Sequence, residues 1–119
     1  TLAQFDTAAH YYATRAHETI HWTGHADRLN RDLTGRFGDD AYAAEELVAE
    51  LGAAMWCAQT GLTTITRADH AAYLAGWLRI LRSDARALVT VASRAQAAVD
   101  WLNTHTGHTA TETVEEVAA

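Results

Sequence analysis

Apolar residues recur at helical spacing through most of the chain, with polar residues or alanines between them. One run shows the pattern clearly and places five residues on one helix face: Leu47, Leu51, Ala54, Met55 and Ala58. We expect this face to be buried. Only the segment "LTTIT", residues 62–66, has the composition of a strand, and the chain contains no proline. The pattern therefore predicts an all-α fold.

Capping residues divide the pattern into a bundle of about four main helices. With their caps, the helices are expected at about residues 6–25, 39–60, 69–81 and 83–103. Each starts at a side chain that can accept a hydrogen bond from free backbone amides: Asp6, Asp39 or Asp40, Asp69 and Ser83. Gly24 and Gly61 stand near the ends of the first two helices. Residues 26–38 are expected to form a polar loop.

Composition agrees with one globular domain over residues 1–103, followed by a polar tail at 104–119. The chain has 119 residues, of which 49% are hydrophobic and 20% charged. No apolar run approaches the roughly 18 residues that a membrane helix needs. The net charge of −6 opposes a large phosphate-binding surface, so we expect no strong nucleic-acid binding by this chain.

The single cysteine and the first residue bear on the setting of the protein. Cys57 lies in an apolar run and is expected to pack as a small core residue, which fits a reducing, cytoplasmic location. The chain begins with Thr1 rather than methionine. We therefore expect it to be a piece of a longer protein with further domains upstream.

The segment "HETIH", residues 17–21, carries the most distinctive chemistry. On a helix, His17 and His21 project from one face, where two imidazoles can bind one Zn²⁺. Glu18 points beside such a metal and can act as a general base on water. HExxH is thus a pattern with a mechanism, although seven histidines make a chance match an alternative. His25 is not expected to join, because eight helical residues rise about 12 Å.

Three carboxylates are candidates for the third metal ligand. Glu46 and Glu50 lie one turn apart on the second helix, and a Glu with an acidic residue four later resembles the gluzincin arrangement. By that analogy Glu46 binds the metal and Glu50 orients a ligand histidine, with the reverse assignment as an alternative. Asp27 stands where the metzincin pattern HExxHxxGxxH has its last histidine, but no Met-turn is evident. Glu45 is expected to point to the opposite face.

A longer stretch resembles a known family. The segments "YYATRAHETIHWTGHADRLNRDLTGRFGDDAYAAEELVAELGAA" and "DHAAYLAGWLRILRSDARALVTVASRAQAAVDWL" are similar to the C-terminal zincin-like metallopeptidase domain of ArdC-type antirestriction proteins. Polyvalent proteins of plasmids and phages, and related plasmid primases, share that domain. The resemblance covers about residues 8–102. It implies a metal site, a link to the transfer of mobile-element DNA, and an upstream module that binds single-stranded DNA.

Two functions follow as expectations. The first is a zinc-dependent metallopeptidase domain, with one Zn²⁺ per chain on His17, His21 and Glu46, water in the fourth position and Glu18 as general base. Its substrate would be a peptide or protein. The second is a non-catalytic module, stabilised by the metal, that assists antirestriction or DNA binding. Glu18 favours the first, since a structural zinc site needs no base.

Overall fold

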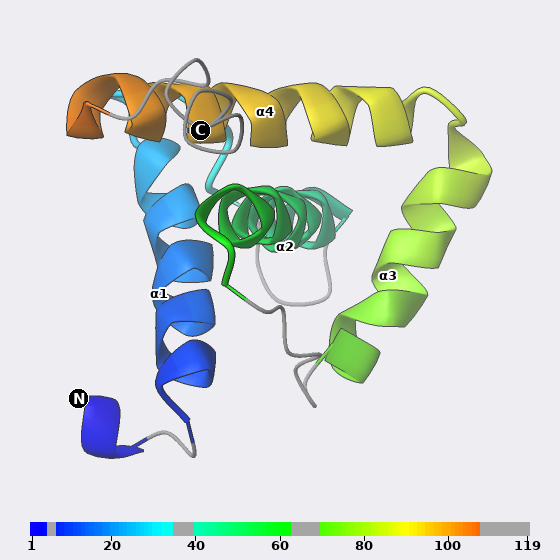
Figure 1. Cartoon of the computed structure of the whole chain (residues 1–119). Helices are drawn as coiled ribbons and strands as arrows, with labels where there is room; N and C mark the ends of the chain where they lie inside the picture. The colour runs from blue at the N-terminus through cyan, green and yellow to red at the C-terminus, as the bar shows by residue number, and fades with distance from the viewer. Residues whose placement is uncertain (5–6, 35–39, 63–69, 108–119) are drawn as a thin grey trace.

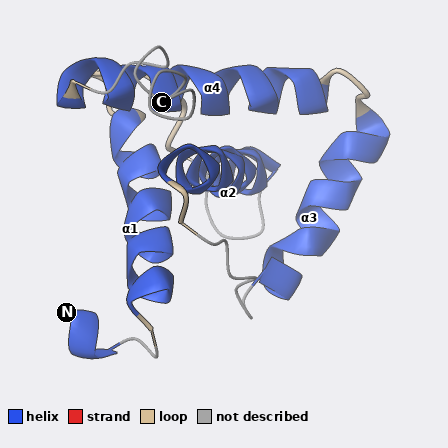
Figure 2. Cartoon of the chain, in the orientation of Figure 1, coloured by secondary structure: helices blue, strands red, loops and turns tan. Residues whose placement is uncertain are grey.

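The described part of the chain folds into four α-helices. In the computed structural model of the protein, residues 1–4, 7–34, 40–62 and 70–107 are described. A short 3₁₀ helix at Leu2–Gln4 precedes α1 (Ala8–Thr23), α2 (Asp40–Thr60), α3 (His70–Ser83) and α4 (Ala87–Thr106). The described ranges include no strand (Figure 2), so the predicted all-α class is confirmed. Of the strand-like segment 62–66, only Leu62 lies within the described residues.

The helix boundaries agree with the sequence at α2 and differ at some of the caps. α2 begins at Asp40 and ends at Thr60, and Gly61 follows with a positive φ of 75°. α1 is capped by Thr7, whose hydroxyl accepts a hydrogen bond from the His10 N–H at 3.1 Å. Asp6, the predicted cap, lies outside the described residues, as do Asp39 and Asp69.

Ser83 was expected to cap α4, and this prediction is wrong. Ser83 is the last residue of α3, and its hydroxyl donates to the Ile80 carbonyl at 2.9 Å. α4 starts four residues later, after Arg86, which makes no side-chain capping bond. A hydroxyl at the end of one helix can bond backward to its own last turn as well as forward, so sequence alone did not distinguish the two arrangements. α4 also continues to Thr106, beyond the predicted end near Asn103.

The second helix lies at the centre of the molecule. In Figure 1 α2 is viewed nearly along its axis, with α1 on one side, α3 on the other and α4 crossing over it. All three neighbours contact α2, and α4 also contacts α1. The core lies between α1, α2 and α4 and contains these residues: Ile20, Val48, Ala49, Val91, Ala95, Ala98, Val99 and Leu102. Cys57 is also buried, as predicted.

The buried face of α2 differs from the predicted one. Ala54 and Ala58 are exposed, and Leu47, Leu51 and Met55 are only half-buried. The buried positions are Ala43, Glu46, Val48, Ala49, Gly52, Ala53 and Cys57. A central helix that is packed on several sides buries small residues where its neighbours approach closely. The periodicity of its large residues therefore does not mark the most buried face.

α1 approaches α2 most closely at a glycine beneath the site described below. A Cβ added to Gly52 would lie 3.0–3.1 Å from three side-chain carbons of Ile20. Ile20 is fully buried, so its side chain has no free space into which to move. The close packing of α1 on α2 thus depends on this glycine.

We therefore expect Gly52→Ala to destabilise the fold. The added methyl group should cost about 1–3 kcal/mol in overpacking, which exceeds the roughly 1 kcal/mol that alanine contributes to helix propensity. Thermal unfolding of the metal-free chain measures the net effect. The control is Ala54→Gly, at an exposed position of the same helix, which removes only the propensity term. An unchanged or higher melting temperature for Gly52→Ala would show that the two helices can separate without cost.

Among the described residues, no helix has both the length and the apolar character required to cross a membrane.

Candidate metal centre

Two histidines of α1 and one glutamate of α2 meet between the two helices. His17, His21 and Glu46 each offer a ligand atom, and these atoms lie within 4.8 Å of one another. His17 and His21 are four residues apart on α1, so their rings share one face and pack edge to face with centroids 4.7 Å apart. His17 and Glu46 are almost completely buried. Among the described residues this is the one such cluster of potential ligands.

The distances within the cluster match those between the ligands of a tetrahedral metal. The two Nε2 atoms of His17 and His21 are 3.0 Å apart. Glu46 Oε2 lies 3.3 Å from His17 Nε2, and Glu46 Oε1 lies 3.0 Å from His21 Nε2. Zinc bonds of about 2.0–2.1 Å at tetrahedral angles separate ligand atoms by about 3.3 Å. The residues present thus fit a divalent ion with three protein ligands.

A further carboxylate contacts the second nitrogen of each ring. Glu50 Oε1 lies 2.9 Å from His17 Nδ1. Glu45 Oε1 lies 3.1 Å from His21 Nδ1. Contacts of this kind fix the orientation and tautomer of metal-binding histidines. Glu45 was expected to point to the opposite face, and that expectation is wrong, because α1 crosses α2 closely enough for both Glu45 and Glu46 to reach His21.

The charges in the cluster stabilise one another. Burial alone would lower the pKa of His21, but hydrogen bonds with Glu45 and Glu46 outweigh burial and raise it to about 9. Burial would raise the pKa of Glu46, but its bonds with His17 and His21 lower it to about 2. The pKa of His17 is also raised, because Glu46 and Glu50 outweigh the effect of burial. A metal that binds here must displace protons from the imidazoles.

A cleft opens on one side of the cluster. It has a volume of about 280 Å³ and is lined by residues of α1, α2 and the intervening loop: Glu18, His21, Asp32, Leu33, Ala41, Tyr42, Glu45 and Glu46. Glu18 is exposed, so its carboxylate is open to solvent beside the cluster. Two potential ligands and a candidate base therefore border a single space that is large enough for part of a substrate.

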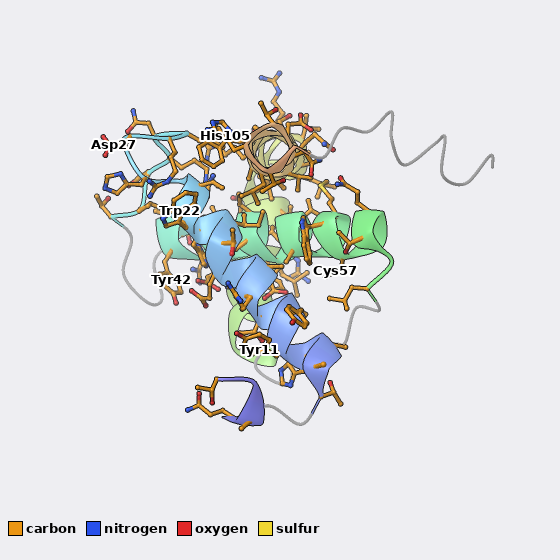
Figure 3. The ribbon with its side chains drawn as sticks, turned by 60° about the vertical axis from the view of Figure 1, so that its left-hand side comes forward. Tyr11, Trp22, Asp27, Tyr42, Cys57 and His105 are labelled. Carbon is orange, nitrogen blue, oxygen red and sulfur yellow. The ribbon has the colours of Figure 1, made fainter. Side chains whose placement is uncertain are left out.

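The remaining candidates from the sequence lie elsewhere. Asp27 is in the loop that follows α1 (Figure 3), and its side chain is 84% exposed. Its carboxylate lies 3.6 Å from Nδ1 of His25, whose side chain is 56% exposed. Neither residue belongs to the converging group of potential ligands. α1 ends at Thr23, so His25 stands outside the helix, in a turn.

Sequence reasoning missed three residues around this site. Tyr42 lines the cleft from the first turn of α2 (Figure 3). Glu45 contacts His21, and Arg31 in turn contacts Glu45. The close spacing of Tyr42 and Glu45 to Glu46 on one helix was a usable signal. Arg31 gave no such signal, because the polar loop also contains Arg28 and Arg36.

Comparison with known proteins places this fold and site in a class. Residues 1–94 match the model of a family described as zincin-like metallopeptidase. The match covers most of the chain, and the chain therefore belongs to this family.

Individual relatives agree with that assignment. The antirestriction protein ArdC of plasmid R388 was solved in an Mn(II)-bound and a metal-free structure. The chain is 48% identical to the Mn(II)-bound structure with a TM-score of 0.77, covering 87% of the chain and 38% of ArdC. For the metal-free structure the identity is 45%, the TM-score 0.75, and the coverage 92% and 39%.

Similar sequences occur in longer bacterial proteins. The uncharacterized protein y4eC of Sinorhizobium fredii is 51% identical over 86% of the chain and 33% of its own length. A DNA primase TraC of Escherichia coli is 39% identical over 83% of the chain and 9% of its own length. The chain thus spans about a third or less of these two relatives.

Proposed function

We propose that this chain is a zinc-dependent peptidase domain of the gluzincin type. His17, His21 and Glu46 would hold one Zn²⁺ per chain, and Glu18 would act as the general base. The observation that carries the proposal is the convergence of two Nε2 atoms and one carboxylate at 3.0–3.3 Å. Because three protein ligands leave one position of a tetrahedral ion open, the arrangement is typical of a catalytic rather than a structural zinc site.

The choice of Zn²⁺ follows from the donor set. Two imidazoles and one carboxylate form a ligand set of known catalytic zinc sites. Mn²⁺ also accepts imidazole and carboxylate, and one structure of the related ArdC contains Mn(II). Zn²⁺ binds most nitrogen and oxygen sites more tightly than Mn²⁺ does, which supports zinc where both ions are present.

The residues of the cleft would perform hydrolysis as follows. A bound divalent ion supplies Lewis acidity, which makes water more acidic and polarises a peptide carbonyl. The Glu18 carboxylate accepts a proton as the water oxygen attacks the carbonyl carbon. It then donates that proton to the amide nitrogen as the C–N bond breaks. Glu45 and Glu50 hold the two histidine rings through their Nδ1 atoms.

The experiment that tests the proposal measures metal and cleavage together. Elemental analysis of the purified chain is expected to find about one zinc per molecule. The variant His17→Ala/His21→Ala should lose the metal, because it removes two of three ligands. Hydrolysis of a quenched fluorescent peptide library should stop on chelation and return on addition of Zn²⁺. Equal metal content in the wild type and the double variant would refute the proposed site.

A second function, a metal-stabilised interaction module, is favoured by one observation. The described residues include no strand beside the cleft on which an extended peptide could pair. In this case the domain would bind a host protein or assist DNA binding by the rest of a longer protein. Antirestriction, which ArdC's name states for that protein, would then be supported without hydrolysis.

The binding partners proposed for this chain follow from its cleft and its net charge. A peptide or protein is the proposed substrate of the cleft. With a net charge of −6, the chain itself should bind nucleic acid weakly. We propose that single-stranded DNA is bound instead by an upstream module in longer proteins that contain this domain.

A further inference from the structure

A buried arginine lies behind the candidate metal centre. Arg31 follows α1 in the chain, and its side chain is only 5% exposed. Its Nε and Nη2 donate to the two carboxylate oxygens of Glu45 at 3.0 and 2.9 Å. This two-point pairing fixes the plane of the carboxylate as well as its charge.

The guanidinium group is also anchored to the end of α1. Arg31 Nη1 donates to the Thr23 hydroxyl at 2.9 Å, and Nη2 donates to the Ile20 carbonyl at 2.6 Å. Ile20 and Thr23 are both fully buried. Arg31 thus joins the end of the helix that carries both histidines to the carboxylate of α2.

The shared atom in this arrangement is Oε1 of Glu45. It accepts from Arg31 Nη2 at 2.9 Å and lies 3.1 Å from His21 Nδ1. In the neutral ring, a proton on His21 Nδ1 leaves the lone pair of Nε2 directed at the cluster.

We propose that Arg31 is a positioning residue for the metal centre, acting through Glu45 on His21. It holds the Glu45 carboxylate where that group can accept from His21 Nδ1, and so fixes the ring direction and tautomer required for binding through Nε2. The inference rests on the proposed metal-binding function. By this inference, the loop after α1 contributes to metal affinity. Neither the HExxH motif nor the acidic pair of α2 indicates such a contribution.

A glycine near Arg31 provides an independent way to disturb the same contact. A Cβ added to Gly24 would lie 2.8 Å from Arg31 Nη2, its nearest neighbour, and 3.1 Å from the backbone carbonyl of His21. Gly24 has a φ of −77°, which any residue adopts, so backbone strain does not require glycine there. Gly24→Ala should therefore displace the guanidinium without changing any charge.

The test compares metal binding among folded variants. Affinity for Zn²⁺ is measured by competition with a chromophoric chelator, and the visible spectrum of the Co²⁺-loaded chain reports the ligand geometry. Arg31→Met is expected to weaken Zn²⁺ binding by about 10–100-fold, the usual effect of losing a contact behind a ligand. It should also change the Co²⁺ spectrum. Arg31→Lys should recover only part of the affinity, because lysine keeps the charge but cannot pair at two points.

Controls separate positioning from general stability. Arg28→Met removes another arginine of the same loop, one that stacks on Trp22 with its guanidinium carbon 3.7 Å from the ring centroid, and should leave affinity and spectrum unchanged. In an Arg31→Met/Glu45→Gln double variant the loss should not exceed the larger single loss, since both act on His21 through one contact. If Arg31→Met does not fold, as judged by circular dichroism, Gly24→Ala and Arg31→Lys decide the question.

Several results would overturn the inference. Wild-type affinity and an unchanged Co²⁺ spectrum in Arg31→Met would leave Arg31 with a purely structural role. If Arg31→Met does not fold, the same result in both Gly24→Ala and Arg31→Lys would have that meaning. A wild-type chain that binds no metal would overturn both this inference and the proposed function. This test does not measure peptide cleavage. A chain that binds metal but cleaves no peptide would therefore contradict the proposed hydrolase function and leave the positioning role of Arg31 intact.

Discussion

Replacing Glu18 with glutamine is expected to leave the metal content unchanged and to lower peptide hydrolysis by about 10²–10⁴-fold. Glutamine has the shape of glutamate but cannot accept a proton from water at neutral pH. Glu18 is exposed at the cleft beside His21 and Glu46, and it is not one of the three converging ligands. The substitution thus removes the base and keeps the metal site.

The matched control for this experiment is Asp27→Asn. It also removes one exposed carboxylate, but from a side chain in the loop after α1 that does not line the cleft. We expect wild-type cleavage and metal content from it. Melting temperatures of both variants should equal that of the wild type, since neither residue is buried.

The Glu18→Gln variant also distinguishes the two proposed functions. For this test it is placed in a longer protein that contains this domain. Protection of incoming DNA that is lost with Glu18→Gln, while metal is retained, supports chemistry at the site. Full protection with retained metal would exclude a catalytic role for Glu18 in antirestriction and favour the interaction module.

Replacing Glu46 with alanine is expected to have the second large effect, a fall in Zn²⁺ affinity well beyond 100-fold. A residue that only supports a ligand typically contributes about 10–100-fold, and a direct ligand contributes more. Glu46 lies 3.0 Å from His21 Nε2 and 3.3 Å from His17 Nε2, on the side of both rings that would face the ion. Competition with a chelator measures the loss.

Two matched variants serve as controls for the Glu46→Ala result. Glu50→Ala removes the carboxylate that contacts His17 Nδ1 and should cost only the smaller, supporting amount. Asp27→Ala should have no effect on affinity. If Asp27→Ala instead empties the site while Glu46→Ala leaves it full, the third ligand comes from the loop, as in the metzincin pattern, and the arrangement proposed here is wrong.

Local features of the sequence predicted the helices and the candidate histidine pair. The rise and turn of an α-helix place residues i and i+4 together whatever surrounds them, so His17 and His21 could be paired from spacing alone. The boundaries of α2 followed from Asp40 and Gly61 for the same local reason. Ser83 failed as a predicted cap because its hydroxyl had an equally local alternative in the last turn of α3.

Which carboxylates face those histidines was decided by the tertiary structure. Neighbouring residues of a helix point about 100° apart, so the rotation and crossing angle of α2 against α1 determine which of them reach the rings. Burial of Ala49, Gly52 and Ala53, instead of the predicted leucine face, gives the observed rotation. It brings Glu46 to both Nε2 atoms and leaves Glu45 and Glu50 beside one Nδ1 each.

The sequence alone therefore determined the all-α class, the approximate positions of the helices and the two histidines with Glu18 between them, because helix geometry acts over a few residues. Only the tertiary structure decided the contacts of Glu46, Glu45 and Arg31. These contacts join residues 8 to 29 positions apart in the chain, and they depend on how closely α1 packs on α2 at Gly52. No local sequence pattern predicts how closely α1 approaches α2, because that distance depends on the packing of the whole core.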